Sequence, residues 1–157
     1  MKPVEAAPDL SAFLHRPENA AFLEFYDYWL RRSAGKPMPA RADIDPLDIP
    51  RLLPNLFLID VVPGRPRRYR FRLVGTRIAE LEGEITNRFL DEFVPGAAGT
   101  AMARHYDDTV AGRVYVRRET LYWRQREHVN YDVLLLPLSS DGVTVDMLVG
   151  LARYDAK

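Results

Sequence analysis

Candidate catalytic chemistry in this chain of 157 residues centres on His105, which is followed by two acidic residues, Asp107 and Asp108. A buried Asp–His pair is the usual arrangement for proton transfer in small cavity-containing enzymes. The stretch around His105 is polar, and Arg104 flanks it. We therefore expect a solvated or hydrogen-bonded histidine and no catalytic residue.

A second acidic group comprises Asp43, Asp45 and Asp48. Asp45 precedes a proline, and Asp48 precedes a short apolar turn, where aspartate commonly accepts backbone hydrogen bonds. This pattern predicts turns in preference to a metal or acid–base site. The chain contains no cysteine, which excludes disulfides, thiolate metal ligands and flavin–cysteinyl photochemistry.

The charge balance gives no overall field that would attract nucleic acid or anionic lipid, since 22 Lys and Arg offset 22 Asp and Glu. Arg68, Arg70 and Arg72 share one face of a predicted strand, a pattern that suits a sheet edge. No apolar run approaches the roughly 18 residues of a membrane span, and no signal-peptide core is present. We expect a cytoplasmic protein with neither a nucleic-acid nor a membrane partner.

The elements that would position any site follow an unusual order: two strands, a helical middle, and three more strands. This order predicts an α+β fold with a five-stranded antiparallel sheet, the helices covering one face and leaving space for a small molecule. The strands 55–62 and 143–151 are expected at the centre, with the arginine-bearing strands at the rims. The predicted ranges are strands 55–62, 68–75, 114–125, 129–138 and 143–151, with helices between 76 and 112.

The N-terminal part divides into a flexible lead-in over 1–17 and the start of a single domain over 18–157. A helix is predicted over 19–33, ended by Gly35 and Pro37. One helical face carries four aromatic residues, which we expect to pack on the core and to contribute to a homodimer or a partner surface. These residues are Phe22, Phe25, Tyr26 and Trp29.

Three stretches of the chain resemble the PAS superfamily, and more closely the single-domain PAS-like proteins of alphaproteobacteria. They read ARADIDPLDIPRLLPNLFLIDV, RYRFRLVGTRIAELEG and LLLPLSSDGVTVDMLVG. The resemblance covers about residues 18–154 and implies the sheet order B-A-I-H-G, with strand 55–62 as A and 143–152 as I. It also implies that helix 19–33 packs on the sheet face opposite the helical insert.

The function implied by the resemblance is sensing or protein–protein signalling, with no catalytic residues. A small metabolite between insert and sheet would act by shifting a population of states, with a second copy or another signalling protein receiving the signal. A filled cavity would leave a pure interaction domain. The inward-facing candidates for the pocket are Phe71, Leu73, Ile78, Leu81, Phe89, Tyr106, Tyr122, Leu135 and Met147.

Two alternatives stay open at this point. One is a small hydratase- or isomerase-like enzyme, although such folds place their helices before a nearly continuous run of strands. The other is a haem-binding sensor, for which His105 is the one candidate ligand. The sequence requires no cofactor, disfavours haem and flavin, and predicts no metal site.

Overall fold

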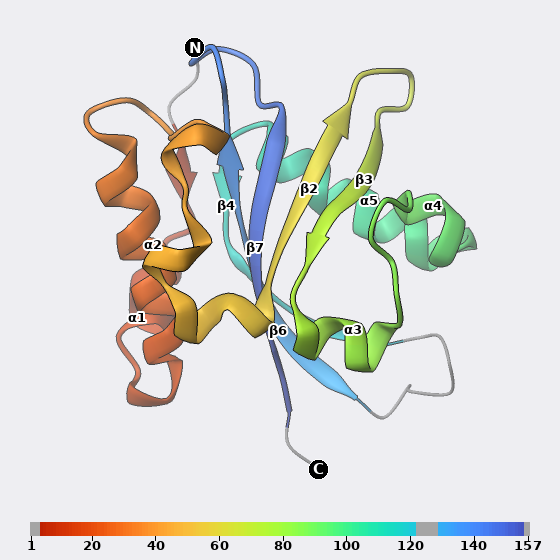
Figure 1. Ribbon diagram of the computed structural model, residues 1–157, viewed down its shortest axis with the longest axis horizontal. Helices are drawn as coiled ribbons and strands as arrows, with labels where there is room; N and C mark the ends of the chain where they lie inside the picture. Colours follow the sequence, from red (N-terminus) through yellow and green to blue (C-terminus); the bar gives the residue numbers. More distant parts are fainter. Residues whose placement is uncertain (1–3, 122–128, 156–157) are drawn as a thin grey trace.

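A five-stranded antiparallel sheet forms the centre of the computed structural model, which describes residues 4–121 and 129–155 (Figure 1). The strand order is β3-β2-β7-β6-β5, which confirms the predicted order B-A-I-H-G. The helical insert separates the second and third of these strands along the chain, as expected. The strands are β2 (Leu56–Val62), β3 (Arg68–Val74), β5 (Val116–Thr120), β6 (Asn130–Leu138) and β7 (Met147–Tyr154).

Helices cover both faces of this sheet, which appears nearly edge-on in Figure 1. On the right lies the insert, formed by α3 (Thr76–Glu82), α4 (Leu90–Phe93) and α5 (Gly96–Val110). On the left lie α2 (Ala20–Ser33) and three short 3-10 turns: η2 (Arg41–Asp43), η3 (Pro46–Asp48) and η4 (Pro50–Asn55). The strongly apolar strands β2 and β7 need this double cover, because both of their faces must leave water.

The segment predicted as a lead-in contains regular structure from residue 5 onward. β1 (Glu5–Ala6) pairs in parallel with β4 (Arg113–Val114), just after α5. α1 (Leu10–Leu14) is followed by the turn η1 (Pro17–Asn19), and both leucines that bound α1 are buried. This segment thus packs on the domain and adds to its core.

Several element boundaries differ from those predicted, among them the start of β7 and the extent of β5, which covers Val116–Thr120 within the predicted 114–125. β7 begins at Met147 and not at 143, because the Asp141 carboxylate accepts hydrogen bonds from the backbone N–H groups of Val143 and Thr144, each at 2.8 Å. This capped turn holds the residues before β7 out of the sheet. α5 begins at Gly96, inside the range 76–112 over which helices were expected.

The pairing of β2 with β3 contains a bulge. Leu58 pairs with Leu73, whereas the next residue, Ile59, pairs with Phe71. Arg72 is therefore an extra residue on β3, and the alternation of side chains reverses across it. Phe71 faces the insert, and Leu73 faces α2.

A close approach between two central strands shapes the insert face of the sheet. Gly150 of β7 pairs with Phe57 of β2, and the Phe57 ring lies over the glycine. A Cβ atom at position 150 would lie 2.2 Å from this ring, closer than real Cβ contacts allow. Only glycine lets Phe57 lie this close to the sheet.

Candidate functional site

A small cavity lies between the sheet and the helical insert, with a volume of about 20 Å³. A cavity needs roughly 10–15 Å³ of such space to hold one water molecule, so this one accommodates a ligand of very few atoms. Its walls combine aromatic rings with polar and charged groups. The lining residues are Phe57, Phe71, Ile78, Glu82, Phe93, Met102, Tyr106, Arg117, Tyr131, Val133, Ala152 and Tyr154.

Helix α3 positions the acidic side chain of this cavity. Ile78 and Glu82 are four residues apart and therefore lie on the same face of the helix. The helix begins after Gly75, where a Cβ atom would lie 2.3 Å from the carbonyl oxygen of Pro54 in η4. It ends at Gly83, which has a φ of 88°. Glycines at both ends thus fix where Glu82 enters the core.

Glu82 is a buried carboxyl group, with 8% of its surface exposed. The Tyr154 hydroxyl donates a hydrogen bond to Glu82 Oε2. Among the described residues, this is its only side-chain partner, and no Lys, Arg or His forms an ion pair with it. Burial raises the pKa of Glu82 to about 7, and the hydrogen bond from Tyr154 opposes this rise.

Three tyrosines surround the carboxyl group. Tyr131 and Tyr154 are directly opposite each other on β6 and β7, with ring centroids 5.0 Å apart. Tyr106 of α5 packs edge-on against Tyr69, with ring centroids 5.1 Å apart. Burial raises the pKa of Tyr106, Tyr131 and Tyr154, so their hydroxyl groups stay neutral at physiological pH.

Arg117 of β5 is the cationic residue of the cavity wall, and its side chain is only 7% exposed. Its guanidinium donates a hydrogen bond to Glu119 Oε1 at 2.8 Å. The guanidinium carbon lies 5.8 Å from the centre of the Tyr106 ring. Arg117 is thus already neutralised by a neighbour on its own strand.

The structure brings together only some of the predicted pocket residues. Phe71, Ile78 and Tyr106 line the cavity. Leu81, Leu135 and Phe89 do not line it: the two leucines are buried elsewhere, and the Phe89 ring packs under the Arg68 guanidinium. Tyr122 lies outside the described residues.

Two further candidates lie on the opposite face of the sheet. The bulge at Arg72 directs Leu73 towards α2, where it lines a second cavity of about 10 Å³ with Leu58 and Val149. Met147 lies two residues before Val149 on β7 and therefore shares its face. The assignment of Leu73 to the insert side was wrong because of this bulge. The assignment of Met147 was wrong because the residues of β7 that line the first cavity, Ala152 and Tyr154, lie on the opposite face of the strand.

The aromatic helix packs on this second face, as the resemblance implied. Phe22, Phe25 and Trp29 are each at most 2% exposed within this one chain. Trp29 Nε1 also donates a hydrogen bond to the carbonyl oxygen of Pro137, at 3.0 Å. Only Tyr26 of the predicted dimer residues is half-buried, and it lies beside the exposed side chain of Leu30 in a surface groove.

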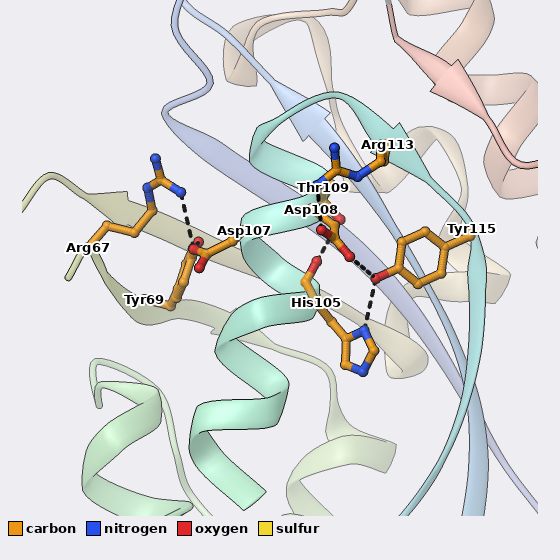
Figure 2. A network of polar contacts seen from close by, with 8 residues as sticks. All are labelled: Arg67, Tyr69, His105, Asp107, Asp108, Thr109, Arg113 and Tyr115. Carbon is orange, nitrogen blue, oxygen red and sulfur yellow. Dashed lines mark hydrogen bonds and ion pairs between the residues drawn. The ribbon is translucent and has the colours of Figure 1, made fainter. Parts of the chain in front are cut away.

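His105 belongs to a polar network on the outer part of α5 (Figure 2). Tyr115 donates its hydroxyl hydrogen to Asp108 at 2.7 Å, so the bond of 2.8 Å between Tyr115 and His105 has the Nδ1–H group of His105 as donor. Arg113 also contacts Asp108, and its hydrogen bond lowers the pKa of that carboxyl. His105 does not line the cavity, and burial lowers its pKa.

The same network ties α5 to the edge strand β3. Figure 2 shows Asp107 accepting hydrogen bonds from Tyr69 and Arg67. His105 is therefore held by the hydrogen bond to Tyr115, and its Nε2 lies 3.7 Å from Glu119 Oε1. Among the described residues no Asp side chain hydrogen-bonds to it, so the Asp–His pair that a hydratase-like site needs is not formed there. Within residues 4–121 and 129–155, no group of three or more His, Asp or Glu side chains could hold a metal ion.

Sequence reasoning missed most of the polar cavity wall, namely Glu82, Arg117, Tyr131 and Tyr154. One signal for Glu82 was available: it stands four residues after Ile78 on the apolar face of a short helix, where a charged residue is unusual. The two tyrosines could be placed together only once the β6–β7 register was known.

The comparisons with known proteins agree with this architecture. A family model described as a PAS domain matches residues 18–153. The chain belongs to the PAS domain family, whose members are generally sensory domains without enzymatic activity. No curated protein matches the sequence.

The solved structures that are similar to the chain include two of a LOV protein. One is the LOV protein of Rhodobacter sphaeroides, with 16% identity and a TM-score of 0.49 over 73% of this chain and 70% of that one. The other is a variant of RsLOV, with 18% identity and a TM-score of 0.48 over 68% of this chain and 63% of that one.

A haem or flavin ring does not fit a cavity of about 20 Å³. Among the described residues, no helix is long and apolar enough to cross a membrane.

Proposed function

We propose that this PAS domain is a cytoplasmic sensory module that binds a small molecule in the Glu82 cavity and passes the signal to another protein. The observation that supports this most is the buried carboxyl group of Glu82, which faces a cavity and has a single hydrogen-bond partner. Carboxyl groups whose pKa is raised by burial and that face a cavity commonly mark a functional site. A structural role alone would favour an apolar residue at this position.

A continuous set of contacts connects the cavity to the opposite face of the sheet. α3 carries Glu82, and its first turn packs against η4 through Gly75. η4 follows η3, where Asp48 accepts a hydrogen bond from Tyr28 of α2 at 2.6 Å and the backbone N–H of Asp45 donates to the same hydroxyl at 3.0 Å. A ligand that favours one position of α3 would thus bias the packing of α2.

Hydrogen exchange can test this coupling. We expect Glu82→Gln to change the exchange rates of backbone amides in α3, in η4 and in α2. The matched control is Glu80→Gln on the same helix, since Glu80 is exposed and pairs only with Arg77. A change confined to α3 would refute the route to α2.

The receiver of the signal in this proposal is a second copy of the chain, which contacts the outward face of α2. Leu30 is 47% exposed there and lines a groove of about 410 Å³ with Tyr26 and Lys36. We expect native mass spectrometry to show a dimer that Leu30→Glu converts to a monomer. A monomeric wild-type protein would refute the second copy as the receiver of the signal.

A further inference from the structure

The Glu82 carboxylate has no compensating positive charge in the cavity. Arg117 is the cation of the cavity wall, but its guanidinium is engaged with Glu119. An isolated buried carboxylate is costly, and it is stabilised either by a proton or by a cation close to it. The site therefore favours a positively charged occupant over a neutral or negative one.

The remaining walls fit the same kind of occupant. The hydroxyl groups of Tyr106 and Tyr131 have no side-chain hydrogen-bond partner among residues 4–121 and 129–155. Their oxygens can accept hydrogen bonds from N–H donors, as can the Glu82 carboxylate. The faces of aromatic rings also attract cations, and ammonium groups enclosed by several rings are a common use of this interaction.

The volume limits the size of the occupant. About 20 Å³ accommodates a group similar in size to a water molecule, such as an ammonium ion or the head of a small primary amine. A larger molecule would require α3 or α5 to move away from the sheet.

We propose that this cavity binds a small ammonium-type cation, with the Glu82 carboxylate as its counter-ion and Tyr106, Tyr131 and Tyr154 as its enclosing walls. The inference rests on the proposed function, because it names the ligand class for the same cavity. The N–H groups of the cation would donate hydrogen bonds to the Glu82 carboxylate and to the tyrosine oxygens.

Binding of such a cation must depend on pH. The titratable and charged groups that line the cavity with Glu82 are Tyr154 from β7, Tyr131 from β6, Tyr106 from α5 and Arg117 from β5. The pKa values of the three tyrosines are raised, so their hydroxyl groups stay neutral between pH 6 and 8, and the raised pKa of Glu82 lies within this range. Since burial raises the pKa of Glu82 to about 7, the cation competes with a proton below that pH. The affinity should fall about tenfold between pH 8 and pH 6.

The experiment is a titration of the protein with ammonium chloride at pH 8, followed by NMR of 13C-labelled tyrosine rings. We expect saturable shifts of the Tyr131 and Tyr154 ring signals, about tenfold weaker binding at pH 6, and no saturable response to sodium chloride. Glu82→Gln should abolish the response, while Glu80→Gln should keep it. Tyr131→Phe keeps the charge and the ring, and should weaken binding without abolishing it.

Methylammonium chloride separates two sources of this chemistry: tighter binding than ammonium indicates a primary amine, and weaker binding indicates the free ion. Equal shifts with potassium chloride, or with the neutral probe methanol, would overturn the proposal. So would binding that does not change between pH 6 and pH 8, or the absence of saturation in the wild-type protein. Any of these results, combined with intact hydrogen-exchange coupling between α3 and α2, would leave the proposed sensory function standing.

Discussion

The two faces of the sheet are built from the same strands yet differ in chemistry. The face towards α2 encloses a cavity of about 10 Å³ whose walls are almost entirely apolar, with residues such as Phe25, Leu56 and Val149. The face towards the insert has Glu82 and Arg117 within its cavity wall. One face thus contributes stability, whereas the other retains polar groups that cost stability and that a ligand can use.

The largest expected effect comes from the apolar face. Trp29→Ala removes a side chain that is 2% exposed and its hydrogen bond to Pro137. We expect the free energy of unfolding in urea to fall by about 3–5 kcal/mol. Glu24→Ala on the same helix is the control and should change it by less than about 1 kcal/mol, since Glu24 forms only a surface ion pair with the exposed Arg51 among the described residues. A similar loss for both variants would show that α2 does not pack as described.

The second effect concerns Glu82, whose pKa is raised in the folded state, whereas folding more commonly lowers the pKa of a carboxyl group. Its pKa is about 7 in the folded state and near 4.5 in the unfolded state. Between these two pH values the folded protein therefore keeps a proton that the unfolded chain has released. Stability should therefore fall as pH rises from about 4.5 to about 7, by up to about 3 kcal/mol. In Glu82→Gln this loss should be absent when urea unfolding at pH 5 is compared with pH 8. An unchanged pH dependence in the variant would show that Glu82 ionises normally.

The junction between the two faces gives a smaller effect. Gly75→Ala would place a Cβ atom 2.3 Å from the Pro54 carbonyl oxygen, so that α3 and η4 must move apart. The φ of Gly75 is −64°, which alanine adopts readily, so the whole cost comes from the contact. We expect a loss of about 2 kcal/mol and faster amide exchange in both α3 and η4. A loss near zero would mean that the two faces are not packed together here.

The smallest effect concerns the hydrogen bond to Glu82. Tyr154→Phe removes a donor that lowers the pKa of Glu82, so this pKa should rise above 7 in an NMR titration of the carboxyl carbon. The stability at pH 5 should fall by about 1 kcal/mol. Tyr131→Phe is the matched control, because Tyr131 makes no hydrogen bond to Glu82, and it should leave this pKa nearly unchanged.

The contrast between the faces also explains what the sequence could predict. The strand order followed from β2, which is apolar on both sides and must be central, and from the arginines that mark β3 as an edge strand. Those arginines indeed pair with carboxylates at this edge, as Arg70 does with Asp60 at 2.9 Å. Such signals are strong because they are repeated along a whole strand.

The cavity wall was harder to predict because it depends on single residues. One bulge at Arg72 moved Leu73 to the other face, and no periodic pattern shows where a bulge occurs. Glutamate is a residue type that normally lies at the surface, and Glu82 is buried because α3 packs on the sheet. Tyr131 and Tyr154 are 23 positions apart, so their contact follows only from the register of two strands.

The missing side chain at Gly150 has a consequence for how this domain could change over time. A larger residue there would push the Phe57 ring away from the sheet and towards the cavity that both Phe57 and Glu82 line. A single added methyl group would fill that space from within. The same fold could thus pass from a receptor that needs a ligand to one held permanently in its occupied shape, through one substitution at an uncharged position of β7.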